Sequence, residues 1–143
     1  MKVYIAAAFH RQHEMREVAS QIRVLGITVT SRWLDEQHIS KDSPEYEVFL
    51  VKQAQMDADD LYAADTMVRF SDDLSTPTIP SVWGTGSRFE ETGMAHALGK
   101  KIIVVGGKQS LFDRLPKRIH LPNVDALINW LRTRFYLDCW EAK

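Results

Sequence analysis

Residues 3–33 read VYIAAAFHRQHEMREVASQIRVLGITVTSRW, and this stretch decides the fold. Residues 3–8 form a short apolar run with the length of a buried strand. Four apolar residues then recur at spacings of three and four, namely Met15, Val18, Ile22 and Leu25. This spacing predicts an amphipathic helix over residues 12–25, which Gly26 can end. The β-branched residues of 27–33 predict a second strand parallel to the first, so the stretch is a βαβ unit.

The rest of the chain continues to alternate between helix and strand patterns. Ser43-Pro44-Glu45 has the residue types of a helix start, and the predicted helix extends to about Ala64. Three further strands are expected at residues 67–70, 101–105 and 118–121, with helices over about 89–99 and from Asn123 onward. This alternation, without internal repeats, predicts a single domain over residues 1–143 with a three-layer α/β/α architecture and a parallel five-stranded sheet.

The composition excludes several classes of protein. Eighteen Lys and Arg against nineteen Asp and Glu give a net charge of -1, which provides no basic surface for a nucleic-acid polymer or an anionic membrane. The single cysteine, Cys139, cannot form an internal disulfide, which favours a reducing cytosol. No apolar run approaches the roughly 20 residues that span a bilayer, and the first residues do not resemble a signal peptide. We therefore expect a cytoplasmic protein.

Ligands of parallel α/β sheets bind beyond the carboxyl ends of the strands, which selects four loops as candidate binding segments. These loops cover residues 7–12, 34–42, 71–89 and 106–111. Residues 71–87 contain two prolines and two glycines and show neither a helical nor an alternating period. A loop of this length inside a compact domain is usually functional or mobile, so the third segment is a strong candidate.

Glu91 occupies an unusual place in the helix after this long loop. At helical spacing it shares the packed face with Met94, Ala95 and Leu98, whereas its neighbour Glu90 points toward solvent. The helix dipole favours the ionised form of a carboxylate in the first turn, so we expect Glu91 to have a low pKa and to serve as a nucleophile. The alternative, that Glu91 only complements the helix end, stays open.

Asp57 is a second carboxylate on an apolar helix face. The residues at compatible offsets around it are Phe49, Leu50, Gln53, Leu61 and Ala64. Partial burial raises the pKa of a carboxyl group, which makes Asp57 a candidate general acid. Asp59 lies on the opposite side of the helix and Asp60 at its edge, so these acids diverge and no metal site is expected. One carboxylate of low pKa and one of raised pKa correspond to the division of labour in retaining glycosyl transfer.

Several other motifs give weaker indications. The run Gly84-Thr85-Gly86-Ser87-Arg88 precedes a helix and offers close backbone approach, two hydroxyls and a guanidinium to an anionic or polyhydroxyl ligand. The sequence lacks both the dinucleotide-binding and the P-loop glycine patterns, which argues against redox and kinase chemistry. The five histidines are scattered and form no HExxH metal-binding pattern. Trp33 and Trp83 could stack on a base, although ordinary packing is the commoner reason for a tryptophan.

The sequence around Glu91 resembles that of a known family. Residues 91–106 read ETGMAHALGKKIIVVG, which is similar to the E-x-G-x-A-x-A-x-G-K motif and following apolar strand of the nucleoside 2-deoxyribosyltransferase family. This family also contains 2'-deoxynucleoside 5'-monophosphate N-hydrolases. The first strand, and Asp57 with the Ala64-Asp65 pair that follows it, are similar to the family pattern as well. The resemblance covers about residues 2–131.

The resemblance implies a flavodoxin- or Rossmann-like, doubly wound sheet and a site built at a homodimer contact. It implies that Glu91 is the nucleophile at C1' of a 2-deoxyribosyl group, that Tyr4 orients this carboxylate, and that Asp57 protonates the departing base. Ser87 and Arg88 would contact the 5' side of the sugar. The candidate substrate contacts in full are Ala7, Phe9, His10, Arg11, Trp33, Gly86, Ser87 and Arg88. Neither a cofactor nor a metal is expected.

The sequence leaves three hypotheses about the function open. The leading hypothesis is transfer of a 2-deoxyribosyl group between nucleobases through a covalent Glu91 intermediate. The first loop departs from the family pattern at His10 and Arg11, which with Arg88 could bind a 5'-phosphate, so the alternative is hydrolysis of a nucleoside 5'-monophosphate. A non-catalytic nucleotide-sensing module is the third. The expected partners are a small nucleoside or nucleotide, a free nucleobase and a second copy of the chain, and neither a nucleic-acid polymer nor a membrane.

Overall fold

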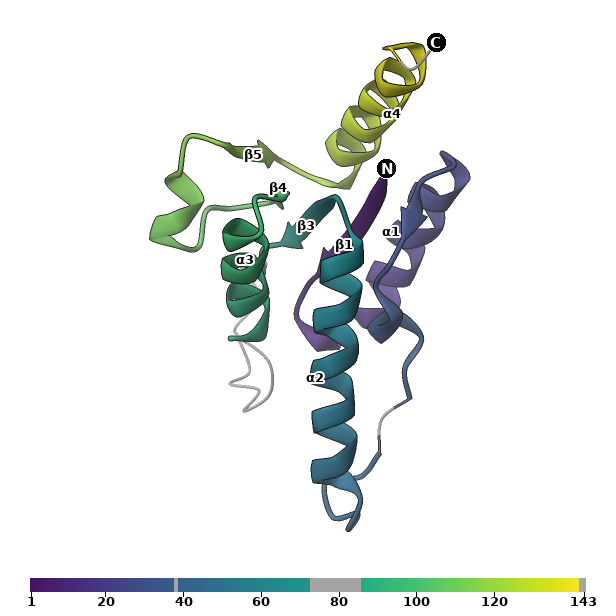
Figure 1. Cartoon of the computed structure of the whole chain (residues 1–143), viewed down its shortest axis with the longest axis vertical. Coiled ribbons are helices and arrows are strands. Elements are labelled where there is room, and N and C mark those ends of the chain that lie inside the picture. Colours follow the sequence, from purple (N-terminus) through teal and green to yellow (C-terminus); the bar gives the residue numbers. More distant parts are fainter. Residues whose placement is uncertain (38, 73–85, 142–143) are drawn as a thin grey trace.

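The computed structural model describes residues 1–37, 39–72 and 86–141, with side chains to residue 137, and in this part of the chain five strands form one sheet (Figure 1). The strands are β1 (Lys2–Ala6), β2 (Thr28–Val29), β3 (Thr66–Phe70), β4 (Lys101–Val105) and β5 (Arg118–Leu121). Their order is β2-β1-β3-β4-β5, and every neighbouring pair is parallel. The predicted parallel five-stranded sheet is therefore confirmed.

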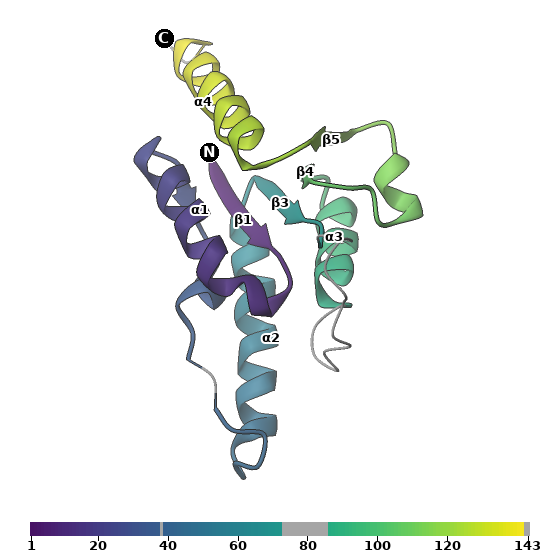
Figure 2. The ribbon, with the colours of Figure 1, turned by 180° about the vertical axis from the view of Figure 1, so that it is seen from behind.

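Helices cover both faces of this sheet. They are α1 (Gln12–Val24), α2 (Tyr46–Ala63), α3 (Ser87–Ala97) and α4 (Val124–Glu141). Figures 1 and 2, which view the molecule from opposite sides, show α2 and α3 over one face and α1 over the other, and α4 packs against α1. The chain moves from β1 outward to β2 through α1 and returns to β3 through α2, which is the winding of a flavodoxin-like sheet. The three-layer, doubly wound fold is confirmed.

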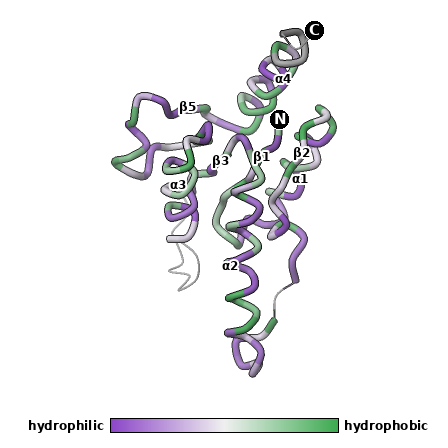
Figure 3. The backbone as a smooth tube through the Cα atoms, in the orientation of Figure 1, coloured by the Kyte–Doolittle hydropathy of each residue, from purple (hydrophilic) through white to green (hydrophobic). Residues whose placement is uncertain are grey.

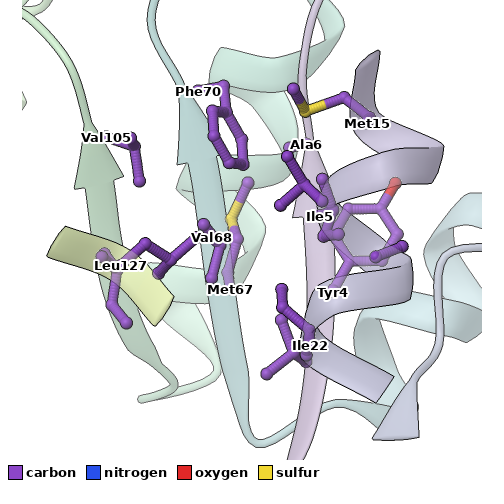
Figure 4. Close-up of a cluster of buried hydrophobic side chains, with 14 of the residues drawn as sticks. Tyr4, Ile5, Ala6, Met15, Ile22, Met67, Val68, Phe70, Val105 and Leu127 are labelled. Carbon is purple, nitrogen blue, oxygen red and sulfur yellow. The ribbon is translucent and has the colours of Figure 1, made fainter. Parts of the chain in front are cut away.

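The buried core surrounds the three central strands. All five residues of β3 are buried, as are the last four residues of β1 and of β4. Figure 4 shows part of this core, and the side chains that it labels are Tyr4, Ile5, Ala6, Met15, Ile22, Met67, Val68, Phe70, Val105 and Leu127. Because helices cover both faces, the central strands need apolar residues at successive positions. This is why continuous apolar runs, not alternating ones, marked them in the sequence.

The helix α2 extends beyond the carboxyl end of the sheet. Its 18 residues span about 27 Å, whereas the five residues of β1 span only about 17 Å, and Figure 1 shows its N-terminal half projecting past the strands. Figure 3 shows hydrophobic residues in this projecting half, where residues 48–51 read VFLV. Val48 and Val51 are exposed, while Phe49 and Leu50 are half-buried. The projecting half of α2 therefore supplies a wall beyond the edge of the sheet.

The second strand is shorter than predicted. Only two residues of β2 pair with β1, and the chain then forms a short 3-10 helix, η2 (Arg32–Asp35). The indole N–H of Trp33 donates a 2.8 Å hydrogen bond to the carbonyl of Ile5. Asp60 accepts two hydrogen bonds of 2.7 Å, one from the backbone N–H and one from Nε of the first residue of η2. These bonds turn the segment away from the sheet, so the predicted strand over residues 27–33 is wrong beyond β2, where tertiary contacts override β-propensity.

Two helices begin away from their predicted starts. The helix α2 begins at Tyr46, and not at Pro44 with Ser43 as its cap, because a turn precedes it in which Oγ of Ser43 accepts a 3.3 Å hydrogen bond from the backbone N–H of Glu45. The helix α3 begins at Ser87, before the predicted start near residue 89. The earlier start places Glu91 fully inside the helix, in its second turn.

Gly26 and Asn123 lie at the helix ends where the sequence places them. Gly26 follows α1 with a φ of 81°, in the left-handed region that favours glycine. The side chain of Asn123 accepts a 2.9 Å hydrogen bond from the backbone N–H of Ala126 at the start of α4.

A 3-10 helix after β4, η3 (Leu111–Arg114), was not predicted. In the described part of the chain no helix is both long enough and apolar enough to cross a membrane. The side chain of Cys139 lies outside the described residues.

Candidate active site

A pocket of about 750 Å³ opens beyond the carboxyl end of β1. Four segments enclose it: the chain after β1 with its 3-10 helix η1 (Phe9–Arg11), η2 with the loop that follows it, the projecting half of α2, and the start of α3. The position agrees with the rule that parallel sheets bind ligands beyond the carboxyl ends of their strands, and the volume suits a small organic ligand.

Tyr4 and Glu91 meet at the inner wall of this pocket. The phenol O–H of Tyr4, on β1, donates a 2.7 Å hydrogen bond to Oε1 of Glu91, on α3. Tyr4 is fully buried, and its burial, with the charges of Glu91 and Asp57, raises its pKa well above the usual value. The phenol therefore keeps its proton and acts as a donor, which fixes the orientation of the Glu91 carboxylate.

The pKa of Glu91 differs from the expectation. Burial is the largest influence and raises this pKa above its usual value, and the charge of Glu90 adds to the rise. The hydrogen bond from Tyr4 and the charge of Arg88 act in the opposite direction. The expected low pKa is therefore wrong, because a favourable position near the start of α3 does not compensate for the removal of the carboxylate from water. Glu90 itself is exposed, as predicted.

Asp57 lines the same pocket from α2. Burial raises its pKa to about 7, and the charges of Glu91, Glu36 and Asp60 contribute to the rise. The buried Oδ1 of Asp57 has no hydrogen-bond partner among the described residues. The expected raised pKa is confirmed. A carboxyl group with a pKa near 7 is partly protonated at neutral pH, which is the condition that a general acid needs.

Glu36, which the sequence did not reveal, and Gln53 add a polar surface to the pocket. Burial raises the pKa of Glu36, the charge of Asp60 adds to this rise, and a hydrogen bond with Gln53 opposes it. Oε1 of Glu36 and Oε1 of Gln53 are buried and, within the described part of the chain, lack hydrogen-bond partners. With Oδ1 of Asp57 they make three hydrogen-bond acceptors on residues that line one pocket. The complement of such acceptors is a ligand that carries N–H donors.

Phe9 and Trp33 form an apolar wall of the pocket. Their ring centroids lie 6.1 Å apart, and the ring planes are inclined by 49°. The hydrogen bond from Trp33 to Ile5 holds the indole against the end of β1, where only 6% of the residue is exposed. Trp33 thus both packs in the core and lines the pocket. Trp83, the other tryptophan considered for stacking on a base, lies outside the described residues.

The other predicted substrate contacts divide into two groups. Ala7, His10 and Ser87 line the pocket. Arg11, Gly86 and Arg88 are not among the described residues that line it, and Gly86 is the N-cap residue of α3. Gly84 and Thr85, from the same glycine-rich run, lie outside the described residues. The structure therefore brings together three of the polar and small residues expected at the site and leaves both arginines out of it.

Both arginines make other contacts near the end of β3. Nη1 of Arg11 donates a 2.7 Å hydrogen bond to the carbonyl of Ser71, and its Nη2 lies 2.6 Å from Oε1 of Glu14. Arg88 is buried and forms an ion pair with Asp72. These contacts tie the end of β3 to η1 and to α3. Both side chains thus support the pocket from outside.

The sequence missed the pocket residues that come from the loop after η2. Ile39, Ser40 and Lys41 line the pocket, and so does Tyr46 at the start of α2. The rule that ligands bind beyond the carboxyl ends of the strands selected this loop, but an irregular segment has no periodicity that would mark single residues.

Among the described residues, no group of three or more His, Cys, Asp or Glu side chains is arranged to hold a metal ion.

Fold and pocket together define a class of protein. It is a doubly wound α/β protein with two interacting carboxyl groups beyond the end of its first strand, one oriented by a tyrosine and the other with a pKa of about 7. Such a pair is suited to chemistry in which one group attacks and the other transfers a proton.

Solved structures share this fold. A 2-deoxyribosyltransferase of the psychrotolerant bacterium Bacillus psychrosaccharolyticus matches with a TM-score of 0.61 and 21% identity, over 90% of this chain and 91% of that chain. A CMP N-glycosidase of Clostridium botulinum matches with a TM-score of 0.55 and 18% identity, over 93% of this chain and 99% of that chain. Comparison by sequence finds no matching family model and no matching curated protein. At these identities the likeness establishes the fold.

Proposed function

We propose that this protein cleaves the N-glycosidic bond of a 2-deoxynucleoside and transfers the 2-deoxyribosyl group to a second nucleobase. The observation that carries the proposal is the hydrogen bond from Tyr4 to Glu91 in a pocket that Asp57, with a pKa of about 7, also lines. The fold likeness supports it, because a 2-deoxyribosyltransferase and a CMP N-glycosidase are enzymes that act on nucleosides or nucleotides.

In the first step the carboxylate of Glu91 attacks C1' of the sugar. The bond between C1' and the base nitrogen breaks, its electron pair leaves with the base, and Asp57 gives its proton to the base. The products are a glycosyl ester on Glu91, a neutral free base and an ionised Asp57. Proton transfer accelerates the step because a neutral base leaves more readily than its anion.

In the second step a nitrogen of the incoming base attacks C1' of the ester. The bond between C1' and Glu91 breaks, which restores the carboxylate, and the proton of the incoming base passes to Asp57. Two displacements at C1' retain its configuration. Water in place of the base gives hydrolysis, so the apolar wall of Phe9 and Trp33 favours transfer by excluding water and receiving a base.

The surroundings of the two carboxyl groups support these roles. Glu91 accepts the hydrogen bond from Tyr4, which favours its ionised form. Oδ1 of Asp57 is buried with no partner among the described residues, which favours its protonated form. For a pair that holds a single proton, these surroundings favour its position on Asp57. In this state the site contains the nucleophile and the acid that the first step requires.

Hydrolysis of a nucleoside 5'-monophosphate is the second candidate. Two basic side chains, His10 and Lys41, line the pocket and would attract a 5'-phosphate. The fold likeness to a CMP N-glycosidase supports this candidate too. Arg11 and Arg88 do not line the pocket, so on this proposal His10 and Lys41 supply the phosphate contacts.

A homodimer is the assembly that we expect for this site. Val48 and Val51 on the projecting half of α2 are 72% and 70% exposed, so α2 presents apolar surface close to the pocket wall. Light scattering at micromolar concentration tests this expectation, and a monomer would count against a shared site.

A product assay tests the proposed reaction. The protein is incubated with 2-deoxynucleosides or their 5'-monophosphates, with and without a second free base, and the products are separated by chromatography. Transfer yields a new deoxynucleoside only when the base is added, whereas hydrolysis releases base and sugar phosphate without it. Glu91→Gln should abolish either reaction, while Glu90→Gln, at the neighbouring exposed position, should retain it. Tight binding without release of base would identify a sensor and overturn the proposal.

A further inference from the structure

A second cavity, of about 530 Å³, lies against the other side of α3. The residues of α3 that line it, which include Phe89, Thr92 and His96, lie on the helix face opposite that of Ser87 and Glu91. Figures 1 and 2 both show α3 between α2 and the segment that carries η3 and β5. No described residue lines both cavities, so the second is separate from the candidate active site.

Arg69, on β3, is one of the residues that line this cavity. Its side chain is fully buried, and Nη2 donates a 2.6 Å hydrogen bond to Oδ2 of Asp113. Its guanidinium carbon lies 4.8 Å from the ring centre of Phe89. Nε and Nη1 of Arg69 are buried and have no hydrogen-bond partner among the described residues. A guanidinium is always charged at physiological pH, so these N–H groups remain donors that need an acceptor.

Arg118 presents a second guanidinium to the same cavity. It is the first residue of β5 and is half-buried, so it lies nearer to solvent than Arg69. Its Nε and Nη1 are also buried, and the described residues again provide no acceptor for them. Two arginines that line one cavity therefore carry, between them, four buried nitrogen donors without an acceptor among the described residues.

The one acidic side chain among the described residues of the lining does not neutralise both arginines. Asp113 already accepts hydrogen bonds at Oδ2 from Arg69 and, at 2.9 Å each, from the backbone N–H groups of Gln109 and Ser110. These bonds hold η3 against β3, and all three are accepted by the same oxygen of the carboxylate. Two guanidinium charges against one carboxylate leave a net positive charge in the cavity.

We propose that this second cavity is an anion-binding site in which Arg69 and Arg118 hold the phosphate group of free phosphate or of a small phosphate monoester. Guanidinium groups match phosphate oxygens through paired, charge-assisted hydrogen bonds. The volume exceeds that of a phosphate ion, and Phe89 and the exposed Phe112 give the cavity apolar walls that suit the carbon part of an ester. The site does not depend on the reaction proposed for the first pocket.

Isothermal titration calorimetry of the intact protein in a buffer free of oxyanions tests the site. Inorganic phosphate and ribose 5-phosphate are the probes, and each should bind saturably with one ion per chain. Arg118→Gln should weaken binding at least tenfold, Arg118→Lys should restore part of it, and thermal unfolding should show that both variants fold. Tighter binding of ribose 5-phosphate identifies an ester as the ligand, and equal binding identifies free phosphate.

Two matched variants locate the binding. Arg114→Gln changes an exposed arginine of η3 that does not line the cavity and should bind like the unaltered protein. Lys41→Gln changes a cation of the first pocket and should leave the binding of inorganic phosphate to the second cavity unchanged. Absence of saturable binding overturns the proposal, and so does equal binding by Arg118→Gln. Loss of binding in Lys41→Gln alone overturns it as well, because the anion then occupies the first pocket.

Discussion

The phenol of Tyr4 and the carboxylate of Glu91, 87 positions apart in the chain, are joined by a hydrogen bond of 2.7 Å. Tyr4 belongs to a buried central strand, and Glu91 belongs to a helix that packs on that sheet. The bond lowers a pKa that burial raises, so it preserves the ionised form of the carboxylate. The relationship therefore links the core of the fold to the proposed nucleophile.

Tyr4→Phe removes only the hydroxyl group that donates this bond. A hydrogen bond to a charged group contributes about 1.5–3 kcal/mol, so kcat/KM should fall roughly tenfold to hundredfold. Because the bond lowers the pKa of Glu91, its loss should also move the acid limb of the pH–rate profile to higher pH. Tyr62→Phe, at an exposed position of α2, is the matched control and should change neither quantity. A loss of activity with an unmoved acid limb would show that Tyr4 does not act through Glu91.

The pKa of Asp57 should set the alkaline limb of the pH–rate profile. The first step needs Asp57 in its protonated form, and its pKa is about 7. The rate should therefore decline as the pH rises above about 7, with Glu91 controlling the acid side. Asp59→Asn, at an exposed position of the same helix, should leave the alkaline limb in place. A rate that stays constant to pH 9 would exclude Asp57 as the general acid.

The same raised pKa predicts that Asp57 lowers stability at alkaline pH. The pKa rises from 3.8 to about 7 on folding, so the folded protein holds the proton more tightly than the unfolded chain. This stabilising contribution is complete below pH 3.8 and is lost as the pH rises through 7. At about 1.4 kcal/mol per pKa unit, and with a reduction for partial exposure, Asp57→Asn should raise the free energy of unfolding at pH 8 by about 2 kcal/mol. Urea titrations should show this gain growing between pH 5 and pH 8, and a gain independent of pH would contradict the cause.

The sequence predicted the fold well because burial on both faces leaves a clear pattern. The continuous apolar runs of β1, β3 and β4 and the apolar spacing of α1 follow directly from their places in the core. The segment after β2 departs from this pattern. Its path depends on hydrogen bonds from Trp33 to Ile5 and from η2 to Asp60, between residues far apart in the chain. No local periodicity reports such contacts, which is why a strand was predicted there.

The candidate site was predictable only in part for the same reason. Asp57 stood out because a carboxylate on an apolar face is unusual, whereas Glu36 lies in an irregular loop where nothing marks it. The prediction of a low pKa for Glu91 was wrong because the position of a residue in a helix is visible in a sequence, whereas its depth of burial is not. Arg11 and Arg88 were natural candidates for an anion until their acidic partners became known.

Asp60 is a buried acid that should matter for stability. Only 6% of it is exposed, and it accepts hydrogen bonds of 2.7 Å from the backbone and from Nε of Arg32. Asp60→Ala leaves these donors without an acceptor, so the free energy of unfolding should fall by about 2 kcal/mol. Asp59→Ala, at the exposed neighbouring position, should change it by less than about 0.5 kcal/mol. Equal effects in denaturant titrations would show that η2 does not depend on Asp60.

Glu36 should determine which nucleobases the proposed enzyme accepts. Its buried Oε1 and that of Gln53 are acceptors without partners in the described part of the chain, so the pocket favours bases that carry an amino group, such as adenine or cytosine. Glu36→Gln replaces one acceptor by a donor. It should raise KM for amino-bearing bases by about tenfold, with a smaller effect on kcat, and should favour bases that carry a carbonyl group at that position.

Steady-state kinetics with paired bases, adenine against hypoxanthine and cytosine against uracil, measure this change in preference. Glu47→Gln alters an exposed glutamate of α2 that does not line the pocket, and it should leave the preference unaltered. A uniform fall in kcat for all four bases in Glu36→Gln would instead assign Glu36 to the electrostatics of Asp57, whose pKa its charge raises. If Glu36 accepts a hydrogen bond from the base, its loss must weaken the binding of an amino-bearing base more than that of a carbonyl-bearing base. An unchanged ratio of the two KM values in Glu36→Gln would therefore show that Glu36 does not recognise the base.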